Sequence, residues 1–270
     1  MPTTETAYAK INLALHVRAR RDDGYHELET LFAFVDQGDV LTAHPADADA
    51  LHQQGEFADD LGLPFGNLVA RALGKLPRPT GLTIALDKRL PVAAGLGGGS
   101  ADAGAVFRIV REMYGLPDDW HARAAALGAD VPACVKSRTC IGRGTGTELE
   151  RADDGLAGTP VLLVNPREGL STADVFARWS GGDRGPLPEG DARRIALDGR
   201  NDLEDPAIAL CPAISEILDA LRGTSPILAR MSGSGATCFA LYDDEKRRDQ
   251  AAEQIASSHS YWWQMKGSLR

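Results

Sequence analysis

Four glycines stand within five positions in the stretch Pro-Val-Ala-Ala-Gly-Leu-Gly-Gly-Gly-Ser-Ala-Asp, residues 91–102. Glycine adopts positive φ angles easily and lets a ligand approach the backbone closely. An apolar run at residues 82–86 predicts a buried strand before this stretch, and apolar residues at helical spacing predict a helix after it. We expect Ser100 to cap that helix and Gly115 to end it. Because amides at a helix N-terminus attract anions, the stretch predicts a phosphate-binding loop.

This loop differs from the common phosphate-binding motifs. No Gly-Lys-Ser/Thr closes it as in a Walker A loop, and Ser100 stands where the dinucleotide fingerprint needs its last glycine. The His-Arg-Asp and Asp-Phe-Gly signatures of protein kinases are absent from the sequence. A flexible glycine turn without a ligand is the alternative, but the flanking strand and helix favour a phosphate site.

Two charged residues outside the loop could complete a phosphoryl-transfer site. Asp130 is followed by Val-Pro, which is unfavourable inside a helix, so we expect it in a turn at a helix end. Lys10 lies on a predicted half-buried strand at residues 9–18, where alternation places it on one polar face with Asn12 and His16. The carboxylate could accept a proton from a hydroxyl, and the ammonium could offset charge on the phosphoryl group. A turn aspartate and a solvated strand lysine are the alternatives.

Two further features suggest ligand contacts. Arg-Arg-Asp-Asp-Gly at residues 20–24 predicts a hairpin turn, and Tyr25 and His26 follow at its tip. A phenol ring beside an imidazole could stack on a base and hydrogen-bond to its edge; the alternative is a packed tyrosine and a solvated histidine. A second glycine-serine loop, Met-Ser-Gly-Ser-Gly-Ala-Thr at residues 231–237, lies between two predicted strands.

The composition limits the partners and the compartment. The chain has 270 residues and a net charge of −9, which argues against general binding to nucleic acid or to a membrane surface. No apolar run approaches the length of a membrane span, and the N-terminus lacks the pattern of a signal peptide. The cysteines show no metal-binding spacing, so we interpret them as reduced core thiols of a cytoplasmic protein: Cys134, Cys140, Cys211 and Cys238.

The order of strands and helices in the second half predicts an antiparallel sheet covered by helices on one face, an α+β arrangement. Polar residues 153–159 predict a linker, which divides the chain into domains at residues 1–155 and 156–270. We expect the polar segment 44–60 to be a surface excursion and the Gly/Pro-rich segment 180–190 to be mobile.

Six segments in order make the chain resemble the GHMP kinases, and among them the branch that acts on a cytidine diphosphate derivative of methylerythritol. They are Ala-Lys-Ile-Asn-Leu at 9–13, Asp-Gly-Tyr-His-Glu-Leu at 23–28, Asp-Lys-Arg-Leu-Pro at 87–91, the loop at 95–100, Leu-Gly-Ala-Asp-Val-Pro at 127–132 and Ser-Gly-Ser-Gly-Ala at 232–236. Asp-Gly-Tyr-His and Gly-Ala-Asp-Val-Pro discriminate this branch, because the glycine loops are shared across the superfamily. The matches span nearly the whole chain.

The resemblance implies a two-domain α+β GHMP kinase fold, with an N-terminal domain like domain 2 of ribosomal protein S5 and a ferredoxin-like C-terminal layer. It implies ATP-dependent phosphorylation of the 2-hydroxyl of the methylerythritol unit in non-mevalonate isoprenoid synthesis. Mg²⁺ would bridge the ATP phosphates, with no protein ligand assigned, and a homodimer is left open. Lys10 and Asp130 are the implied catalytic pair.

The resemblance also assigns binding residues. Tyr25 and His26 would hold the cytosine, and Asn12 would lie beside the methylerythritol end. Gly233, Ser234 and Gly235 of the second loop would close the site. The implied ATP-binding residues are Pro91, Val92, Ala93, Ala94, Gly95, Leu96, Gly97, Gly98, Gly99, Ser100 and Ala101.

The sequence departs from the commonest pattern of this kinase branch at two places, and three rival functions can be weighed against it. Tyr8 stands where proline is frequent, and Ala101-Asp102 replaces a frequent Ser-Asn, which leaves open whether Asp102 approaches magnesium. A homoserine or mevalonate kinase is one rival, but neither substrate offers a base for Tyr25. A catalytically silent GHMP-fold binding protein would be expected to lack Lys10 or Asp130. A nucleic-acid binder with the S5-like fold conflicts with the acidic charge.

Overall fold

The computed structural model describes residues 2–62, 66–153 and 155–270, and the chain forms two compact units. The first comprises Met1–Lys10, Gln37–Val92 and Gly97–Ser137, and the second comprises the remaining segments: Ile11–Asp36, Ala93–Leu96 and Arg138–Arg270. Strands β1 (Thr3–Arg20) and β2 (His26–Ala46) each run from one unit into the other. Both units combine helices and antiparallel strands, which confirms the predicted α+β class. The predicted linker at 153–159 includes residue 154, which lies outside the described residues.

The first unit holds the two ends of the phosphate loop, up to Val92 and from Gly97 onwards. In its sheet, β4 pairs antiparallel with the C-terminal half of β2 and parallel with β3. Helix α2 follows the loop and is buried from Ala101 to Val110, so it forms the centre of this unit. Besides its parts of β1 and β2, the unit contains β3 (Ala50–Gln54), η1 (Asp59–Leu61), α1 (Leu68–Lys75), β4 (Gly81–Asp87), α2 (Gly98–Tyr114), α3 (Trp120–Ala125) and α4 (Val131–Lys136).

Helices α2 and α4 pack backbone against backbone at one glycine. A Cβ atom on Gly104 would lie 2.7 Å from the carbonyl carbon and oxygen of Cys134, so only glycine permits this approach. Arg108 on α2 then donates to the Cys134 carbonyl oxygen at 2.6 Å and to the Ser137 hydroxyl at 2.9 Å. These contacts fix α4, whose first residue directly follows Asp130, on the helix that begins at the phosphate loop.

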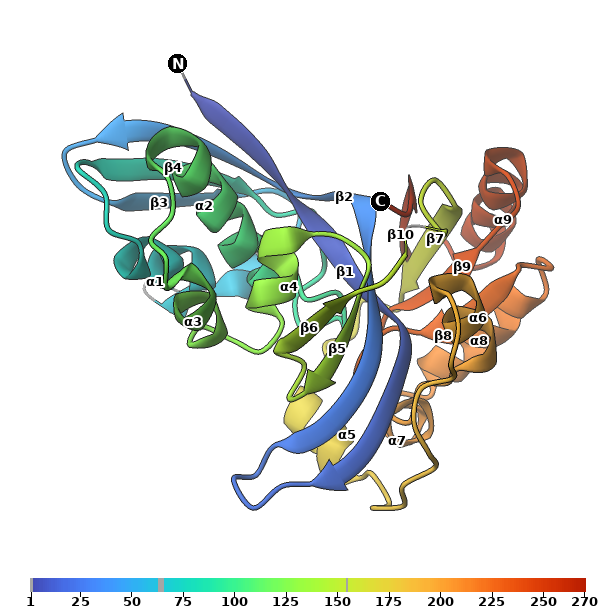
Figure 1. Cartoon of the computed structure of the whole chain (residues 1–270). Coiled ribbons are helices and arrows are strands. Elements are labelled where there is room, and N and C mark those ends of the chain that lie inside the picture. The colour runs from blue at the N-terminus through green and yellow to red at the C-terminus, as the bar shows by residue number, and fades with distance from the viewer. Residues whose placement is uncertain (1, 63–65, 154) are drawn as a thin grey trace. The chain divides into compact units, whose positions relative to one another are not determined.

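The second unit contains a four-stranded sheet in the order β10-β7-β9-β8, in which every pair is antiparallel (Figure 1). All six residues of β7 are buried, and Leu162 and Val164 pack in one core with apolar residues of the covering helices. The N-terminal half of β2 pairs with β5, and β5 pairs with β6. The elements are β5 (Cys140–Gly144), β6 (Glu148–Arg151), β7 (Pro160–Asn165), α5 (Thr172–Ala177), α6 (Ala192–Asp198), α7 (Glu204–Ile208), α8 (Ala213–Arg222), β8 (Leu228–Met231), β9 (Cys238–Leu241), α9 (Glu245–Ser258) and β10 (Trp263–Ser268).

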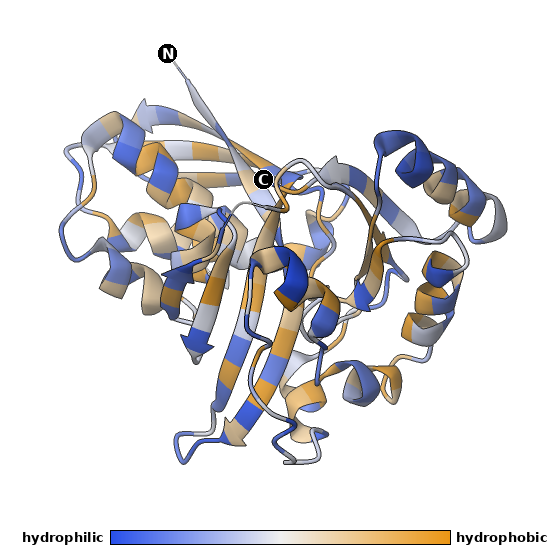
Figure 2. Cartoon of the chain, turned by 45° about the vertical axis from the view of Figure 1, so that its right-hand side comes forward, coloured by the Kyte–Doolittle hydropathy of each residue, from blue (hydrophilic) through white to orange (hydrophobic). Residues whose placement is uncertain are grey.

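Strand β1 differs from the half-buried strand that its pattern predicts. Figure 2 shows hydrophobic and hydrophilic residues alternating along the hairpin of β1 and β2, yet every residue from Ala9 to Val17 is buried. The polar face is therefore also inside the protein, and each polar side chain on it has a partner. Lys10 pairs with Asp130, Asn12 donates to Thr30, and His16 bonds to a backbone carbonyl. This excludes the alternative of a solvated strand lysine at position 10.

Two further local predictions are wrong. Helix α2 begins at Gly98 with Gly97 as its N-cap in the left-handed conformation, so Ser100 lies inside the first turn rather than at the cap. The segment 44–60 is not simply a surface excursion, because β3 pairs there with β4 as an edge strand. Its polar residues are tolerated because an edge strand keeps much of its surface in water.

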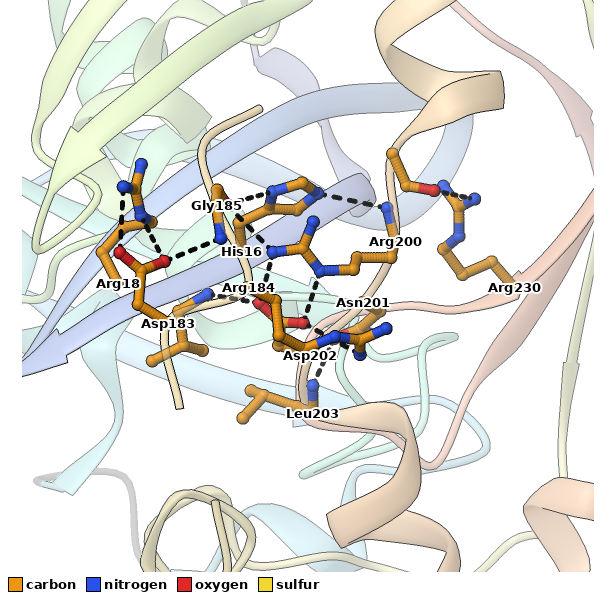
Figure 3. A network of polar contacts seen from close by, with 12 residues as sticks. His16, Arg18, Asp183, Arg184, Gly185, Arg200, Asn201, Asp202, Leu203 and Arg230 are labelled. Carbon is orange, nitrogen blue, oxygen red and sulfur yellow. Dashed lines mark hydrogen bonds and ion pairs between the residues drawn. The ribbon is translucent and has the colours of Figure 1, made fainter. Parts of the chain in front are cut away.

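The segment 180–190, predicted to be mobile, is held by a network of polar contacts in the second unit (Figure 3). Arg18 binds Asp183 through two hydrogen bonds of 2.9 and 3.0 Å. Glu29 accepts from the backbone N–H of Leu187 at 2.7 Å. Composition alone suggested freedom, but the partners come from β1 and β2, far away in the sequence.

His16 in this network must be neutral (Figure 3). Its Nδ1 lies 3.1 Å from the carbonyl oxygen of Gly185, which can only accept, so Nδ1 carries the proton. Its Nε2 accepts from the backbone N–H of Arg200 at 3.2 Å, and a second proton would break that bond. Burial is the largest cause that lowers the pKa of His16 below its ordinary value, and the bond to Gly185 partly opposes it.

We expect the free energy of unfolding to decrease as the pH falls below about 6.5, because the unfolded chain then protonates His16 while the folded chain resists protonation. Above that pH the imidazole is neutral in both states and its contribution is constant. One such group gives a slope of up to ~1.4 kcal/mol per pH unit. Urea denaturation of wild type and His16→Gln between about pH 5 and pH 8 measures it. The exposed His121→Gln is the control, and equal slopes in wild type and His16→Gln would contradict the prediction.

Candidate active site

Lys10 and Asp130 meet in the first unit, although 119 residues separate them in the chain. The Nζ atom of Lys10 lies 3.0 Å from Oδ2 of Asp130, and the side chains are 5% and 32% exposed. Asp130 is the N-cap residue of α4, as the prediction of a helix end requires, with Pro132 tolerated in the first turn. Its carboxylate does not cap the described helix but faces the ammonium instead. The carboxylate therefore remains partly open to a ligand while its charge is balanced.

Gly97 places the phosphate loop against this pair. It has a φ of +61°, and an added Cβ atom would lie 2.9 Å from Cε of Lys10 and 3.8 Å from Oδ2 of Asp130. A side chain at position 97 would therefore displace the lysine. The N-terminus of α2 and the Lys10–Asp130 pair are thus immediate neighbours within one unit.

The first turn of α2 offers backbone donors beside the pair. Gly98, Gly99, Ser100 and Ala101 form this turn, and no described side chain caps it. The first amides of a helix have no partner within the helix, and the helix dipole adds partial positive charge there. The amide of Ala101 bonds back to Gly97, which leaves the preceding amides of the turn for an anion. The predicted residues Pro91 and Val92 belong to the same unit.

The middle of the loop, Ala93–Leu96, belongs to the second unit and packs there against the second glycine-serine loop. Ser232 donates its hydroxyl to the carbonyl oxygen of Gly95 at 2.8 Å, and the N–H of Thr237 donates to Ala94 at 3.1 Å. Gly95 has a φ of +76°, and a Cβ atom there would lie 2.3 Å from the Ser232 carbonyl oxygen. The two loops that the sequence analysis singled out are therefore directly joined.

The second loop also contacts Asn12. The Ser232 hydroxyl accepts from the backbone N–H of Asn12 at 3.2 Å, and Oδ1 of Asn12 would lie 3.1 Å from a Cβ atom on Gly233. The side-chain amide of Asn12 donates to Thr30 at 2.7 Å, which fixes its orientation. Ser234 exchanges a hydrogen bond with Thr172 at 2.8 Å. Asn12 and the second loop thus form one polar cluster of the second unit.

Tyr25 and His26 lie at the hairpin between β1 and β2, as predicted, but their environments differ. Tyr25 is 62% exposed. The His26 ring lies 4.6 Å from the ring of Phe176 and 5.7 Å from that of Trp179, measured between centroids. Its Nε2 atom is buried without a hydrogen-bond partner among the described residues. Burial, and to a lesser degree Arg20, lowers the pKa of His26, so a neutral ring is available to a ligand.

Several supporting residues are not among the predicted site residues. The rings of Phe176 and Trp179 pack against the ring of His26. Asn201 donates hydrogen bonds of 2.8 Å to the carbonyl oxygens of Met231 and Gly233 in the second loop. Phe176 lies in α5 and Trp179 follows that helix closely, so two aromatic residues near one another were a usable signal. Asn201 gave none, because nothing local distinguishes it from other loop asparagines.

Metal ligands can be tested on the acidic residues. Within residues 2–62, 66–153 and 155–270, no group of three or more His, Cys, Asp or Glu side chains is arranged to hold a metal ion. Asp102, which the sequence left open as a neighbour of magnesium, is fully buried and lies 3.1 Å from Nζ of Lys88. Its position therefore does not favour a metal-binding role. All four cysteines are buried, as expected of core thiols.

Two family models match the chain: "GHMP kinases N terminal domain" over residues 67–138 and "GHMP kinases C terminal" over residues 187–260. Together they cover more than half of its length. The fold, with a glycine loop beside a lysine–aspartate pair, and these matches define a kinase of the GHMP class.

The relatives narrow this class. A 4-diphosphocytidyl-2-C-methyl-D-erythritol kinase of Erythrobacter litoralis is 63% identical over 271 residues, 99% of this chain and 99% of its own length. One of Novosphingobium aromaticivorans is 65% identical over 270 residues, 100% of this chain and 94% of its own length. The chain belongs to the 4-diphosphocytidyl-2-C-methyl-D-erythritol kinase family.

Solved structures agree with this assignment. A crystal structure of 4-(cytidine 5'-diphospho)-2C-methyl-D-erythritol kinase matches with a TM-score of 0.83 and 35% identity, covering 99% of both chains. Homoserine kinase from Cytophaga hutchinsonii matches with a TM-score of 0.68 but only 15% identity, which shows the fold alone. The resemblance and the two-domain GHMP kinase fold are confirmed. The domain boundary at residues 155 and 156 lies between the matched regions and stays a prediction.

Proposed function

We propose that this protein transfers the γ-phosphoryl group of ATP to the 2-hydroxyl of 4-(cytidine 5'-diphospho)-2-C-methyl-D-erythritol. Asp130 accepts the hydroxyl proton, and Lys10 balances the charge of the carboxylate and offsets charge on the phosphoryl group. The loop residues 91–101 bind the ATP phosphates through their amides. Phosphoryl transfer of this kind depends mainly on positioning and charge neutralisation, which these groups supply.

One observation carries this proposal: Gly97 at the start of α2 lies against the Lys10–Asp130 pair, whose nitrogen–oxygen distance is 3.0 Å. Donors for a phosphate and a proton acceptor for an alcohol are therefore adjacent within one unit. A catalytically silent binding protein has no need of this arrangement. Relatives with 63% and 65% identity that carry the kinase name support the same substrate.

The direct test is a coupled assay of ADP release with purified protein. We expect turnover with the cytidine diphosphate methylerythritol substrate and none above background with mevalonate or homoserine. Equal turnover with one of the latter two would replace the proposed acceptor. Absence of ADP release with all three would contradict the proposed function itself.

Tyr25 and His26 are proposed to bind the cytosine, because an exposed phenol ring and an unpartnered, buried imidazole nitrogen stand together at one hairpin tip. We expect Tyr25→Ala to raise the KM for the cytidine substrate by the equivalent of roughly 1–3 kcal/mol, the scale of base stacking, with little change for ATP. Steady-state kinetics with each substrate varied in turn measures both constants. Tyr25→Phe keeps the ring and serves as the control. An equal loss for both substrates would argue against base recognition at Tyr25.

We propose that Mg²⁺ reaches the site as its complex with ATP. Bound there, it would neutralise phosphate charge. We expect turnover to follow the concentration of the magnesium complex of ATP rather than that of free ATP. Titrating magnesium into EDTA-treated enzyme at constant total ATP checks this, and turnover independent of magnesium would refute it.

The charge of the chain and the character of its helices bear on its partners and its compartment. The charge of −9 supports a protein that binds neither nucleic acid nor membranes. In the part of the chain that the structure describes, no helix combines the length and apolar character needed to cross a bilayer. Cytoplasmic location and a homodimer stay predictions.

A further inference from the structure

Three ionisable side chains form a buried cluster in the first unit. Lys88 is 1% exposed, and Asp39 and Asp102 are 0% exposed. The ammonium of Lys88 pairs with Oδ2 of Asp39 and lies 3.1 Å from Oδ2 of Asp102. Burying charges costs several kcal/mol per ion unless they are well paired, so a cluster of this kind requires a reason.

The three residues come from the segments on either side of the phosphate loop. Lys88 directly follows β4, and the Oδ1 atom of Asp39, on β2, accepts from the backbone N–H groups of Arg89 at 2.6 Å and Leu90 at 2.8 Å. These bonds fix the backbone where it enters the loop. Asp102 lies on α2 just beyond the first turn, where the chain leaves the loop. Lys88 therefore connects the entry of the loop to its exit.

Gly98 brings the cluster into contact with the loop itself. A Cβ atom at this position would lie 2.9 Å from Nζ of Lys88 and 3.8 Å from Oδ2 of Asp39. The backbone of Gly98, the first residue of α2, therefore lies close to the ammonium of Lys88. A shift of Lys88 would move the amides that face a bound phosphate.

We propose that Asp39, Lys88 and Asp102 are positioning residues, a clasp that holds the two ends of the phosphate loop together and so sets its affinity for nucleotide. The inference rests on the proposed function in that the ligand of the loop is ATP. The clasp does not touch the nucleotide; it acts through the backbone of residues 89–90 and 98–102.

The charge of the clasp also depends on pH. Burial, the largest cause, and the neighbouring Asp39 raise the pKa of Asp102 to about 8, against the opposing effect of Lys88. Burial opposes the charge on Lys88, but the two carboxylates outweigh it and raise the pKa of the ammonium. The charged groups that face Asp102 are Lys88 at the end of β4 and Asp39 on β2. Around neutral pH the clasp is therefore close to neutral, and ionisation of Asp102 adds negative charge near the loop.

The test compares Asp102→Leu with Asp102→Asn by calorimetric titration of ADP in magnesium buffer, without the acceptor substrate. Asp102→Leu removes the tie to α2 but leaves Lys88 balanced by Asp39, and Asp102→Asn keeps an oxygen that accepts from Lys88. We expect the Kd for ADP to rise roughly tenfold in Asp102→Leu. This is the cost of weakening one hydrogen bond from a backbone N–H group to a charged phosphate oxygen. In Asp102→Asn we expect it to stay near the wild-type value.

A matched control lies at the other end of β4. Asp49 accepts from the backbone N–H of Leu82 at 3.0 Å and pairs with Arg78, just as Asp39 holds the loop end of the strand. We expect Asp49→Asn to lower the unfolding midpoint in urea without changing the Kd for ADP. If the clasp has only a structural role, Asp102→Leu should also lower the unfolding midpoint and leave the Kd for ADP unchanged. That result would overturn the proposal.

The pH dependence gives a second readout that packing alone does not produce. We expect nucleotide affinity to fall in wild type as the pH rises through about 8, the value to which the pKa of Asp102 is raised, and to stay flat in Asp102→Asn. An equal pH dependence in the two proteins would overturn the electrostatic part of the proposal. If wild type fails to bind ADP at all, the proposed function is wrong; if wild type binds and Asp102→Leu binds equally well, only the clasp is wrong.

Discussion

Asp130→Asn is expected to lower kcat by roughly 10²–10⁴-fold, the usual contribution of a general base. The amide keeps the shape of the side chain but cannot take a proton from the acceptor hydroxyl. It also removes the charge that balances Lys10 at 3.0 Å, so the pair loses its proton acceptor and the ammonium loses its partner. Nucleotide affinity should change little, because the carboxylate acts on the alcohol rather than on ATP.

Single-turnover kinetics and calorimetric titration with ADP separate these two effects. Asp119→Asn provides the control, because Asp119 is likewise the N-cap of a short helix in the same unit, α3, and is paired with Arg123 at 2.7 Å on the surface. We expect the control to lose some stability and no activity. Near-normal turnover in Asp130→Asn would remove this residue from the catalytic step.

Much of the candidate site follows from local sequence signals. The glycines of the loop, the Asp-Gly turn before Tyr25 and the Val-Pro after Asp130 each restrict the backbone in a recognisable way. These signals correctly located a helix N-terminus, a hairpin tip and a helix end. They did so because backbone geometry depends mainly on neighbouring residues.

What the sequence could not predict depends on tertiary contacts. Alternation along β1 indicated a polar face, but only Asp130 and Thr30, from distant segments, explain why Lys10 and Asn12 are buried there. Asp39 gave no signal, because an aspartate on a strand looks solvated until Lys88 is placed against it. The error at Ser100 has a different cause: a left-handed glycine replaced the usual side-chain cap.

A shared constraint links these observations. In the first unit two buried lysines lie beside the phosphate loop. Lys10 lies close to Gly97, and Lys88 lies close to Gly98. Consecutive glycines therefore have separate steric reasons, one for each lysine. A loop selected only for flexibility would not require this correspondence.

Gly97→Ala is the substitution that tests the steric argument most directly. The new methyl group would lie 2.9 Å from Cε of Lys10, and the φ of +61° is unfavourable for alanine. We expect kcat/KM to fall by about 10²-fold, because a displacement of about 1 Å in a catalytic group has an effect of that size. The loss should appear in kcat as well as in the KM for ATP, since the methyl group disturbs both the lysine and the start of α2.

Gly115→Ala separates this effect from backbone strain. Gly115 ends the same helix with a φ of +84°, and nothing lies within 4 Å of a Cβ atom there. Gly97 has left-handed helical angles, whereas Gly115, with a ψ of 167°, lies in a region that is essentially restricted to glycine. Both substitutions should therefore cost about 1–3 kcal/mol of stability through backbone strain. Only Gly97→Ala should lose activity in excess of its loss of folded protein, measured by urea denaturation and steady-state kinetics on the same samples. If the two variants lose activity equally, strain rather than contact with Lys10 explains the glycine, and the proposed link between the loop and the catalytic pair fails.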